Sequence, residues 1–426
     1  MFSTPDSSNL LSIYQHYSKL ISLEISDIES GLVNLVLPII PEPIIASMCR
    51  NASYYFQREP ILMKLNLDLI IVGDLHGHLL DLLRIIKKFG HPSNTNYLFL
   101  GDIIDRGEFS VETISLIFIM KVLWPQRVFI IRGNHEFKEI CSEGGFLSEI
   151  QSIYGNTNVA KHFFSAFEMI PLAALVHNKV LCIHGGIGPN VEQISDIEKV
   201  SRPLCGFNEE ISSSILWSDP NETIQSFSPS PRGSGYIFGQ KAFLKFLTQN
   251  NIDLVVRGHE CAEAGITMHF SKRLLTVFSA SNYCGISPNK SAVLAILGSG
   301  LRKEATVFLP LRFIKRNQAI FVKSLQENIF KLPPDVVEEK MTKVSLPVLS
   351  NQVKSEYRGS GMPLPRKSTK PRKNFMQDIK PEVHLSKRRS SESMIMDRRT
   401  NSSIFSLSAT KGLYHSAKSS EIWKDL

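Results

Sequence analysis

The sequence lacks any long uninterrupted run of apolar residues. The longest candidate, Ile114 to Trp124, is broken by Lys121 and stopped by Pro125. A membrane-spanning helix needs about 18 or more consecutive apolar residues, so this run is too short. The N-terminal residues also lack the basic start and apolar stretch of a secretory signal peptide. We therefore expect no membrane segment and a cytoplasmic and/or nuclear location.

Closely spaced cysteines are also absent. The six cysteines are scattered from Cys49 to Cys284, and no two of them form a C-x-x-C pair. A small secreted protein would place its cysteines closer together, and a zinc ribbon would need pairs of them. The pattern therefore predicts free thiols in a reducing compartment.

The positive charge of the chain is not evenly distributed. The formal net charge is +8, but residues 301–426 hold 25 of the 48 Lys and Arg residues and only 12 of the 40 Asp and Glu residues. The basic character thus belongs to the C-terminal segment, whereas residues 1–300 are mildly acidic. An acidic body is typical of a site that is rich in carboxylate ligands.

Short apolar runs that end in glycine or in a polar cluster recur through residues 46–310. Their length and their β-branched or aromatic content favour buried strands, predicted at Leu69–Val72, Tyr97–Leu100, Val128–Ile131, Val180–Ile183, Leu254–Val256 and Leu275–Phe278. The intervening segments predict helices at Asp81–Phe89, Glu112–Leu123, Val159–Met169 and Gln240–Gln249. This alternation predicts an α/β fold with central sheets covered by helices. Two further runs, Ser291–Leu297 and Thr306–Leu311, flank a glycine-rich hairpin turn at residues 298–300.

Three other segments surround this main domain. Residues 1–45 are predicted to be helical and to end at Pro41 and Pro43. Residues 311–332 predict a basic amphipathic helix, with apolar residues at helical spacing. Residues 333–426 are basic and rich in serine, and they cannot bury enough apolar surface to offset chain entropy, which predicts disorder.

Side chains that can bind metals follow five of the predicted strands. The clusters read Gly73-Asp74-Leu75-His76-Gly77-His78, Gly101-Asp102-Ile103-Ile104-Asp105-Arg106-Gly107, Arg132-Gly133-Asn134-His135-Glu136, His184-Gly185-Gly186 and Arg257-Gly258-His259-Glu260. Mixed oxygen and nitrogen ligands suit manganese, iron or zinc. A single cluster of this kind is more often a turn or a helix cap than a ligand site. Five such clusters, each directly after a strand, argue against that purely structural interpretation. Two ions held about 3.5–4 Å apart could activate a water and clamp a phosphoryl group, and Arg106 and Arg232 could grip its oxygens.

The motifs GDLHGH, GDIIDRG, RGNHE, HGG, RGHE and FSASNYCG stand in the order and spacing of a known family. From about Pro43 to Leu311 the chain resembles the phosphoprotein phosphatase family of serine/threonine phosphatases, with ILWSDP and RGSGYIFG as further matches. The resemblance implies a four-layer metallophosphoesterase fold, with two central sheets flanked by helices and residues 46–310 as the catalytic domain.

The resemblance also implies a role for each matching residue. The first metal would be bound by Asp74, His76 and Asp102, and the second by Asp102, Asn134, His184 and His259. Arg106, Arg232 and Asn134 would hold the substrate phosphate, and Tyr283 would overhang the site. His135 would protonate the leaving oxygen, while Asp105 would orient it and keep it charged.

Several positions depart from the pattern of the family. His78 stands where glutamine is usual, Ser281 where proline is usual, and Ile286 where type 1 phosphatases are usually acidic. Gly258 and Glu260 also vary around the metal-type histidine. Some of the motifs resemble those of type 1 phosphatases and others those of calcineurin. We therefore interpret the chain as a divergent member of the family with type 1/calcineurin-like character. The loop changes concern substrate preference rather than the metals.

Three functions are compatible with these motifs to different degrees. The favoured one is a protein serine/threonine phosphatase that acts on phosphoprotein substrates through in-line attack of a metal-activated water. A dinucleoside-tetraphosphatase or another metallophosphodiesterase would share the metal motifs but not ILWSDP, RGSG and SASNYCG. A non-catalytic phosphoprotein-binding scaffold would lack a ligand or the acid, and none is missing.

The two C-terminal segments suggest partners of their own. The helix predicted at 311–332 could dock a regulatory subunit or a calcium-sensor protein, or simply pack on the catalytic domain. The basic tail could carry phosphorylation sites for kinases or a localisation signal, or it could be an unspecific solvated segment. No nucleic-acid module accompanies its charge.

Overall fold

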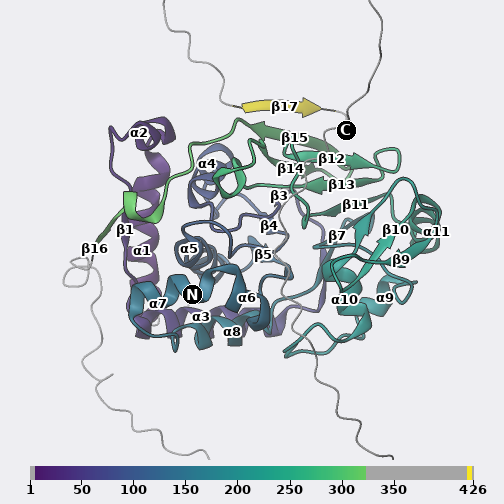
Figure 1. Ribbon diagram of the computed structural model, residues 1–426, viewed down its shortest axis with the longest axis horizontal. Helices are drawn as coiled ribbons and strands as arrows, with labels where there is room; N and C mark the ends of the chain where they lie inside the picture. The colour runs from purple at the N-terminus through teal and green to yellow at the C-terminus, as the bar shows by residue number, and fades with distance from the viewer. Residues whose placement is uncertain (1–4, 323–419, 425–426) are drawn as a thin grey trace, which may run out of the picture. The chain divides into compact units, whose positions relative to one another are not determined.

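Two six-stranded β-sheets lie at the centre of the part of the chain that the structure, a computed structural model, describes, namely residues 5–322 and 420–424 (Figure 1). In spatial order, the first sheet contains β17 (Ser420–Lys424), β15 (Arg302–Phe308), β14 (Ser291–Leu297), β3 (Leu69–Val72), β4 (Tyr97–Phe99) and β5 (Val128–Ile130). The second contains β12 (Ile266–His269), β13 (Leu274–Val277), β11 (Leu254–Arg257), β7 (Val180–Ile183), β6 (Ala173–Val176) and β2 (Leu62–Leu65). Strands β3, β4 and β5 are parallel to one another, as are β7, β11 and β13. Their carboxyl ends therefore carry the predicted metal-binding motifs to common sheet edges.

The two sheets pack on each other through alternate residues of their strands. In β3, Leu69 and Ile71 belong to the core between the sheets, whereas Ile70 and Val72 face a second core under the helices. Val180 and Cys182 of β7 enter the same inter-sheet core from the other side. Strands that are buried on both faces need apolar residues at every position, which explains the continuous apolar runs of the sequence.

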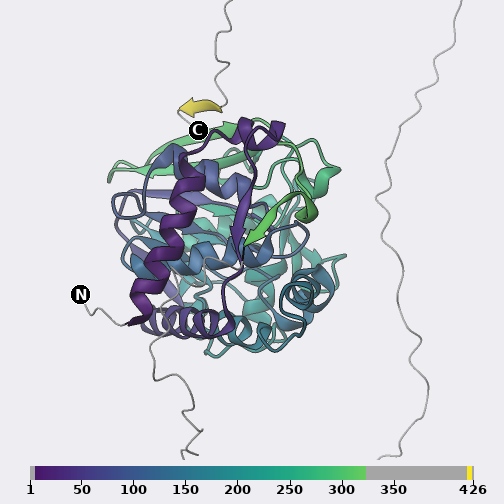
Figure 2. The ribbon, with the colours of Figure 1, turned by 90° about the vertical axis from the view of Figure 1, so that its left-hand side faces the viewer.

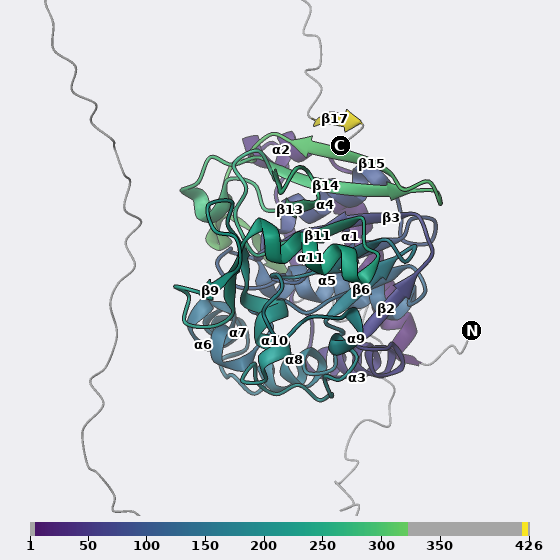
Figure 3. The same ribbon diagram turned by 90° about the vertical axis from the view of Figure 1, so that its right-hand side faces the viewer.

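Helices cover both outer faces of this sandwich, as Figures 1 and 3 show. The first sheet is covered mainly by α1 (Pro5–Ser22), α3 (Glu42–Arg58), α4 (Leu79–Phe89), α5 (Ser110–Leu123), α7 (Phe146–Tyr154) and α8 (Ala160–Phe167). The second is covered by α9 (Ile194–Ile197), α10 (Glu210–Trp217) and α11 (Gln240–Asn250). Together with the two sheets these helices form the four layers, so the predicted fold class is confirmed.

Short elements complete the part of the chain that is described. They are α2 (Ile25–Ser30), α6 (Lys138–Gly144), the 3-10 helices η1 (Tyr283–Gly285) and η2 (Arg316–Gln318), a parallel pair of β1 (Val36–Pro38) and β16 (Ile320–Val322), and a small sheet of β8 (Asp219–Pro220), β10 (Tyr236–Phe238) and β9 (Phe227–Pro229). Figure 2 shows α1 with β1 and β16 nearby. Within residues 5–322 and 420–424, no helix has both the length and the apolar character that crossing a membrane requires.

The N-terminal segment differs from its prediction at its end. Pro41 and Pro43 do not close a helical segment, because Pro41 is the N-cap of α3 and Pro43 lies in its first turn. Proline is tolerated there, since the first N–H groups of a helix have no partner within the helix. Residues of α1 also share one core with the first sheet, so the described part of this segment packs as part of the main domain.

The amphipathic helix predicted at 311–332 is wrong for its described part. Residues 311–315 have no regular structure, η2 follows, and β16 is extended. The backbone pairs with other elements instead: Leu311 N donates to Ser281 Oγ at 3.0 Å, and β16 pairs with β1. These tertiary hydrogen bonds override the helical spacing of the apolar residues, and residues 323–332 lie outside the described part.

The predicted disordered tail, 333–426, also lies outside the described residues except at its end. There, Ser420–Lys424 form β17, which pairs antiparallel with β15. A strand at the edge of a sheet has unpaired N–H and C=O groups, and a second extended segment satisfies them.

Candidate metal centre

The motif residues are brought together by tight turns directly after the strands. His76, Asp102, Asp105 and His259 all have left-handed backbones, with φ between 42° and 70°. Residues other than glycine rarely adopt this backbone conformation, so it marks positions where the surrounding structure fixes the backbone. Gly133 is required for another reason, since a Cβ there would lie 2.2 Å from Asp102 Oδ1.

Asp102 lies at the centre of the cluster. Its Oδ2 is 3.6 Å from His76 Nε2, and its Oδ1 is 3.3 Å from His184 Nε2. Asp102 is 2% exposed, and Asp74 beside it is fully buried. One carboxylate thus faces two separate groups of potential ligands.

The first group surrounds His76. Its Nδ1 lies 2.9 Å from the carbonyl oxygen of Ile104, and because a carbonyl can only accept, Nδ1 carries the hydrogen and leaves Nε2 free to bind a metal. Asp74 Oδ2 is 3.8 Å from that Nε2. His76, Asp102 and His135 also offer ligand atoms within 4.8 Å of one another, so both Asp74 and His135 border this group.

The second group contains Asp102, His184 and His259, whose ligand atoms also lie within 4.8 Å of one another. His184 Nδ1 donates to the carbonyl of Leu100 at 2.8 Å, and its Nε2 lies 2.9 Å from Asn134 Oδ1. The Nε2 of His259 is buried and, within residues 5–322 and 420–424, has no hydrogen-bond partner.

These observations fit a divalent metal site. An orphaned imidazole nitrogen in a buried polar cluster lacks a partner that a cation would supply. Burial, and next the Asp102 carboxylate, raise the pKa of Asp74 to about 7, and a bound cation would reverse that effect by favouring the ionised form. The mixture of carboxylate, amide and imidazole donors suits first-row transition metals.

His135 and Asp105 form a close pair beside the first group. His135 Nδ1 donates to Asp105 Oδ2 at 2.7 Å, and Asp105 Oδ1 accepts from Phe146 N at 2.9 Å. Burial lowers the pKa of His135, but the charges of Asp102 and Asp105 outweigh burial, so its pKa is raised. The geometry can hold a protonated imidazole next to the cluster.

The two arginines predicted to bind phosphate are both exposed but differ in their contacts. Arg106 is exposed, and within the described residues its guanidinium forms no hydrogen bond or ion pair. The Nε of Arg232 donates to Asp219 Oδ2 at 2.6 Å. The ring centroid of Tyr283 lies 5.3 Å from that of His76.

Sequence reasoning missed the residues that hold this arrangement. Glu136 is fully buried and accepts from the backbone N–H of Asp102 at 2.9 Å, of Gly133 at 2.9 Å and of Ile103 at 2.8 Å. Asp219 binds the buried Arg257 at 2.8 Å in addition to Arg232. Both acidic residues stand inside quoted motifs, RGNHE and ILWSDP, which was the available indication of their importance.

Comparison with known proteins also indicates a metallophosphoesterase. Residues 67–263 match the family model described as calcineurin-like phosphoesterase. The protein phosphatase 4 catalytic subunit of Saccharomyces cerevisiae is 37% identical over 269 residues, which are 63% of this chain and 87% of that protein. The chain belongs to the serine/threonine-protein phosphatase family.

Other members of the phosphatase family agree with this placement. A PP2A-like serine/threonine-protein phosphatase of Candida albicans is 39% identical over 282 residues, which are 65% of this chain and 68% of that protein. A solved Saccharomyces cerevisiae phosphatase with similarity to human PP5 superposes with a TM-score of 0.57 at 32% identity, covering 60% of this chain and 83% of that one. The predicted family is confirmed, and these relatives are named as PP4, PP2A-like or similar to PP5 rather than as type 1 phosphatases or calcineurin.

Proposed function

We propose that this chain hydrolyses phosphoserine and phosphothreonine in proteins at a two-metal site. The observation that carries the proposal is the position of Asp102, whose two oxygens lie 3.6 Å from His76 Nε2 and 3.3 Å from His184 Nε2. A carboxylate between two histidine groups is suited to bridge two ions. Membership of the phosphatase family supports the substrate class.

Six side chains would hold the two ions. We assign Asp74, His76 and Asp102 to the first ion, and Asp102, Asn134, His184 and His259 to the second, with manganese, iron or zinc as the candidates. Asp74 is preferred to His135 as a ligand, because a protonated imidazole paired with Asp105 would repel a cation. When bound, the ions would activate a water and neutralise the charge of the phosphoryl group.

His135 is the proposed general acid. Asp105 accepts its Nδ1 hydrogen, which leaves Nε2 as the atom that can give a proton to the leaving serine or threonine oxygen. Asp105 is itself oriented by the Phe146 N–H, so the direction of the imidazole ring is fixed before substrate arrives. Such preorganisation avoids reorganisation during the reaction.

Arg106 and Arg232 are the proposed phosphate-binding residues, assisted by Asn134. A guanidinium offers two parallel N–H donors to phosphate oxygens. Asp219 uses only the Nε of Arg232, and the terminal nitrogens remain available for the substrate. Within the described residues Arg106 has no comparable support, so the phosphate would be the partner that fixes its guanidinium.

Regulatory subunits are a further part of the proposal. Relatives at 37–39% identity are named as catalytic subunits of protein phosphatase 4, a name that implies partner subunits for those proteins. We propose that this chain also binds regulatory subunits. The helix once expected to bind a calcium sensor is absent from 311–322, which removes the basis for that particular partner within the described residues.

The direct test is phosphate release from a phosphothreonine peptide by the purified full chain. We expect release with manganese, loss with a chelator and recovery when manganese is added back. Diadenosine tetraphosphate and a phosphotyrosine peptide serve as comparison substrates, and Asp102→Asn serves as the inactive control. If the folded, manganese-loaded protein released no phosphate from the peptide, or cleaved only the dinucleotide, the proposed function would be wrong.

A further inference from the structure

The loop that carries Tyr283 is tied to a distant segment of the chain. We call residues 281–287 the site loop and residues 309–318 the strap. Ser281 N and Oγ both donate to Asp81 Oδ2, at 2.9 and 3.1 Å, and Ser281 Oγ accepts from the strap at Leu311 N, at 3.0 Å. Proline, the residue usual in the family, has neither an N–H nor a hydroxyl and could make none of these bonds.

Two more contacts join the strap to the site loop. Asn282 Nδ2 donates to the carbonyl of Leu311 at 2.9 Å. The ring of Phe313 lies so near Gly285 that a Cβ there would be 2.9 Å from two ring carbons. The strap therefore fits only against a residue without a side chain, which Gly285 provides.

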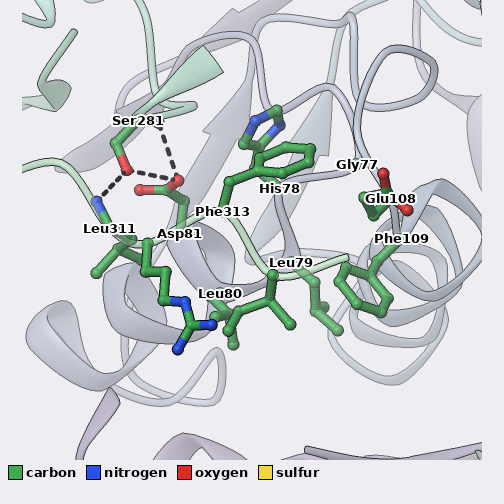
Figure 4. A pocket seen from close by; sticks show the side chains of 12 residues that line it. Gly77, His78, Leu79, Leu80, Asp81, Glu108, Phe109, Ser281, Leu311 and Phe313 are labelled. Carbon is green, nitrogen blue, oxygen red and sulfur yellow. Dashed lines mark hydrogen bonds between the residues drawn. The ribbon is translucent and has the colours of Figure 1, made fainter. Parts of the chain in front are cut away.

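His78 joins the same cluster from the other side. Its ring lies 5.9 Å from the ring of Tyr283 and 5.7 Å from the ring of Phe313. Its Nδ1 donates to the carbonyl of the metal-ligand candidate His76 at 2.9 Å, so the ring cannot turn freely. Figure 4 shows Phe313 beside His78, with Ser281 bonded to Asp81 and Leu311 in the same small pocket.

The strap itself is anchored beyond this cluster. Arg312 N donates to Glu29 Oε1 at 2.5 Å, and Arg312 Nη1 to the Glu29 carbonyl at 2.9 Å. Arg316 binds the buried carboxylates of Glu112 at 2.7 Å and Glu149 at 3.0 Å. A segment held at these two points can restrict the site loop that packs against it.

We propose that Ser281, His78 and Phe313 are positioning residues through which the strap holds Tyr283 over the site. The inference rests on the proposed function, because Tyr283 is assigned there to substrate binding. Two departures from the pattern of the family, His78 and Ser281, thus belong to one contact network. The network sets affinity for the peptide part of a substrate, whereas the metal ligands and His135 set the chemical step.

The first test is Ser281→Ala, which removes the hydroxyl bonds to Asp81 and Leu311 but keeps the backbone bond. We expect KM for a phosphothreonine peptide to rise about fivefold, as loss of a hydrogen-bonded support for binding predicts. The kcat for p-nitrophenyl phosphate, which has no peptide part, should stay within about twofold of wild type. The matched control is Ser165→Ala on the exposed face of α8, where the hydroxyl bonds only to its own helix.

The second test places Ser281→Ala in a Tyr283→Ala background. If Ser281 acts through Tyr283, the substitution raises peptide KM no further there, and Phe313→Leu behaves in the same way. Full additivity with Tyr283→Ala, equal losses on both substrates, or no change in peptide KM would overturn the proposal. Failure of wild type itself on both substrates would instead count against the proposed function, so the two failures are distinguishable.

Discussion

Glu136 offers the sharpest test of how the metal loops are held. Its two carboxylate oxygens accept three backbone N–H groups, two at Oε2 from Asp102 and Gly133 and one at Oε1 from Ile103. In Glu136→Gln the side chain keeps its shape, but one oxygen becomes an NH₂ group that can only donate. At least one buried N–H group then loses its acceptor, whichever way the amide is oriented.

The cost follows from that lost acceptor. An unsatisfied buried donor costs about 1–3 kcal/mol. Burial, and next the charge of Asp102, raise the pKa of Glu136, so removing its charge relieves some repulsion. We therefore expect Glu136→Gln to lower the free energy of unfolding by about 2 kcal/mol. Because the displaced N–H groups belong to Asp102 and its neighbours, bound manganese per chain should fall as well.

Urea unfolding and elemental analysis of the dialysed protein measure the two effects. The matched control is Glu139→Gln, an exposed glutamate three residues further along the chain, which should change neither quantity. An unfolding free energy within about 0.5 kcal/mol of wild type, the range usual for neutral surface changes, together with unchanged manganese content, would refute this role of Glu136.

The remaining predictions concern other parts of the site and the strap. Asp219→Ala, which removes the contacts to Arg232 at 2.6 Å and to the buried Arg257 at 2.8 Å, should lower kcat/KM for a phosphopeptide by about 10-fold or more, whereas Asp253→Ala, which removes an exposed ion pair, should not. His135→Gln should lower kcat on a phosphothreonine peptide by about 10²–10⁴-fold but much less on p-nitrophenyl phosphate, whose leaving group needs no proton; equal losses on both substrates would contradict an acid role. Arg316→Met leaves buried carboxylates unpaired and should cost about 3–5 kcal/mol of unfolding free energy at pH 7.5. Burial, and next a neighbouring carboxylate, raise the pKa of Glu149, so the folded protein binds a proton there that the unfolded protein releases. The free energy of unfolding therefore falls as pH rises through this range. Part of the stability lost in Arg316→Met should be recovered at pH 5.5 in denaturation measurements. A loss that is equal at both pH values would contradict that sign.

Local patterns were sufficient to predict much of the architecture. The apolar runs at residues 69–72 and 180–183 are strands with those bounds, because a strand buried on both faces leaves no position for a polar residue. The hairpin around residues 298–300 joins β14 to β15, although β15 begins four residues earlier than predicted. Its first residues are charged and partly exposed, so no apolar run marks them.

The candidate metal site could be predicted from the sequence for a related reason. Parallel strands bring their carboxyl ends to one edge, so metal-type side chains after β3, β4 and β5 must lie near one another. His76 and Asp102 could therefore be chosen from the motifs alone. Their supports could not, because the partners of Glu136 are backbone N–H groups, which any sequence contains.

The sequence by itself predicted the strands β3, β4, β5, β7, β11 and β13, the helices α4, α5, α8 and α11, and a set of candidate metal ligands, since each prediction depends on residues that are close along the chain. Only the tertiary structure decided the conformation of residues 311–322, where pairing with β1 and the bond from Leu311 to Ser281 outweigh helical spacing. It also decided that Asp219 holds Arg232 and that Phe313 meets Gly285. Such contacts join segments whose separation along the chain is unrelated to their distance in space, and their energies are set by geometry that no local pattern contains.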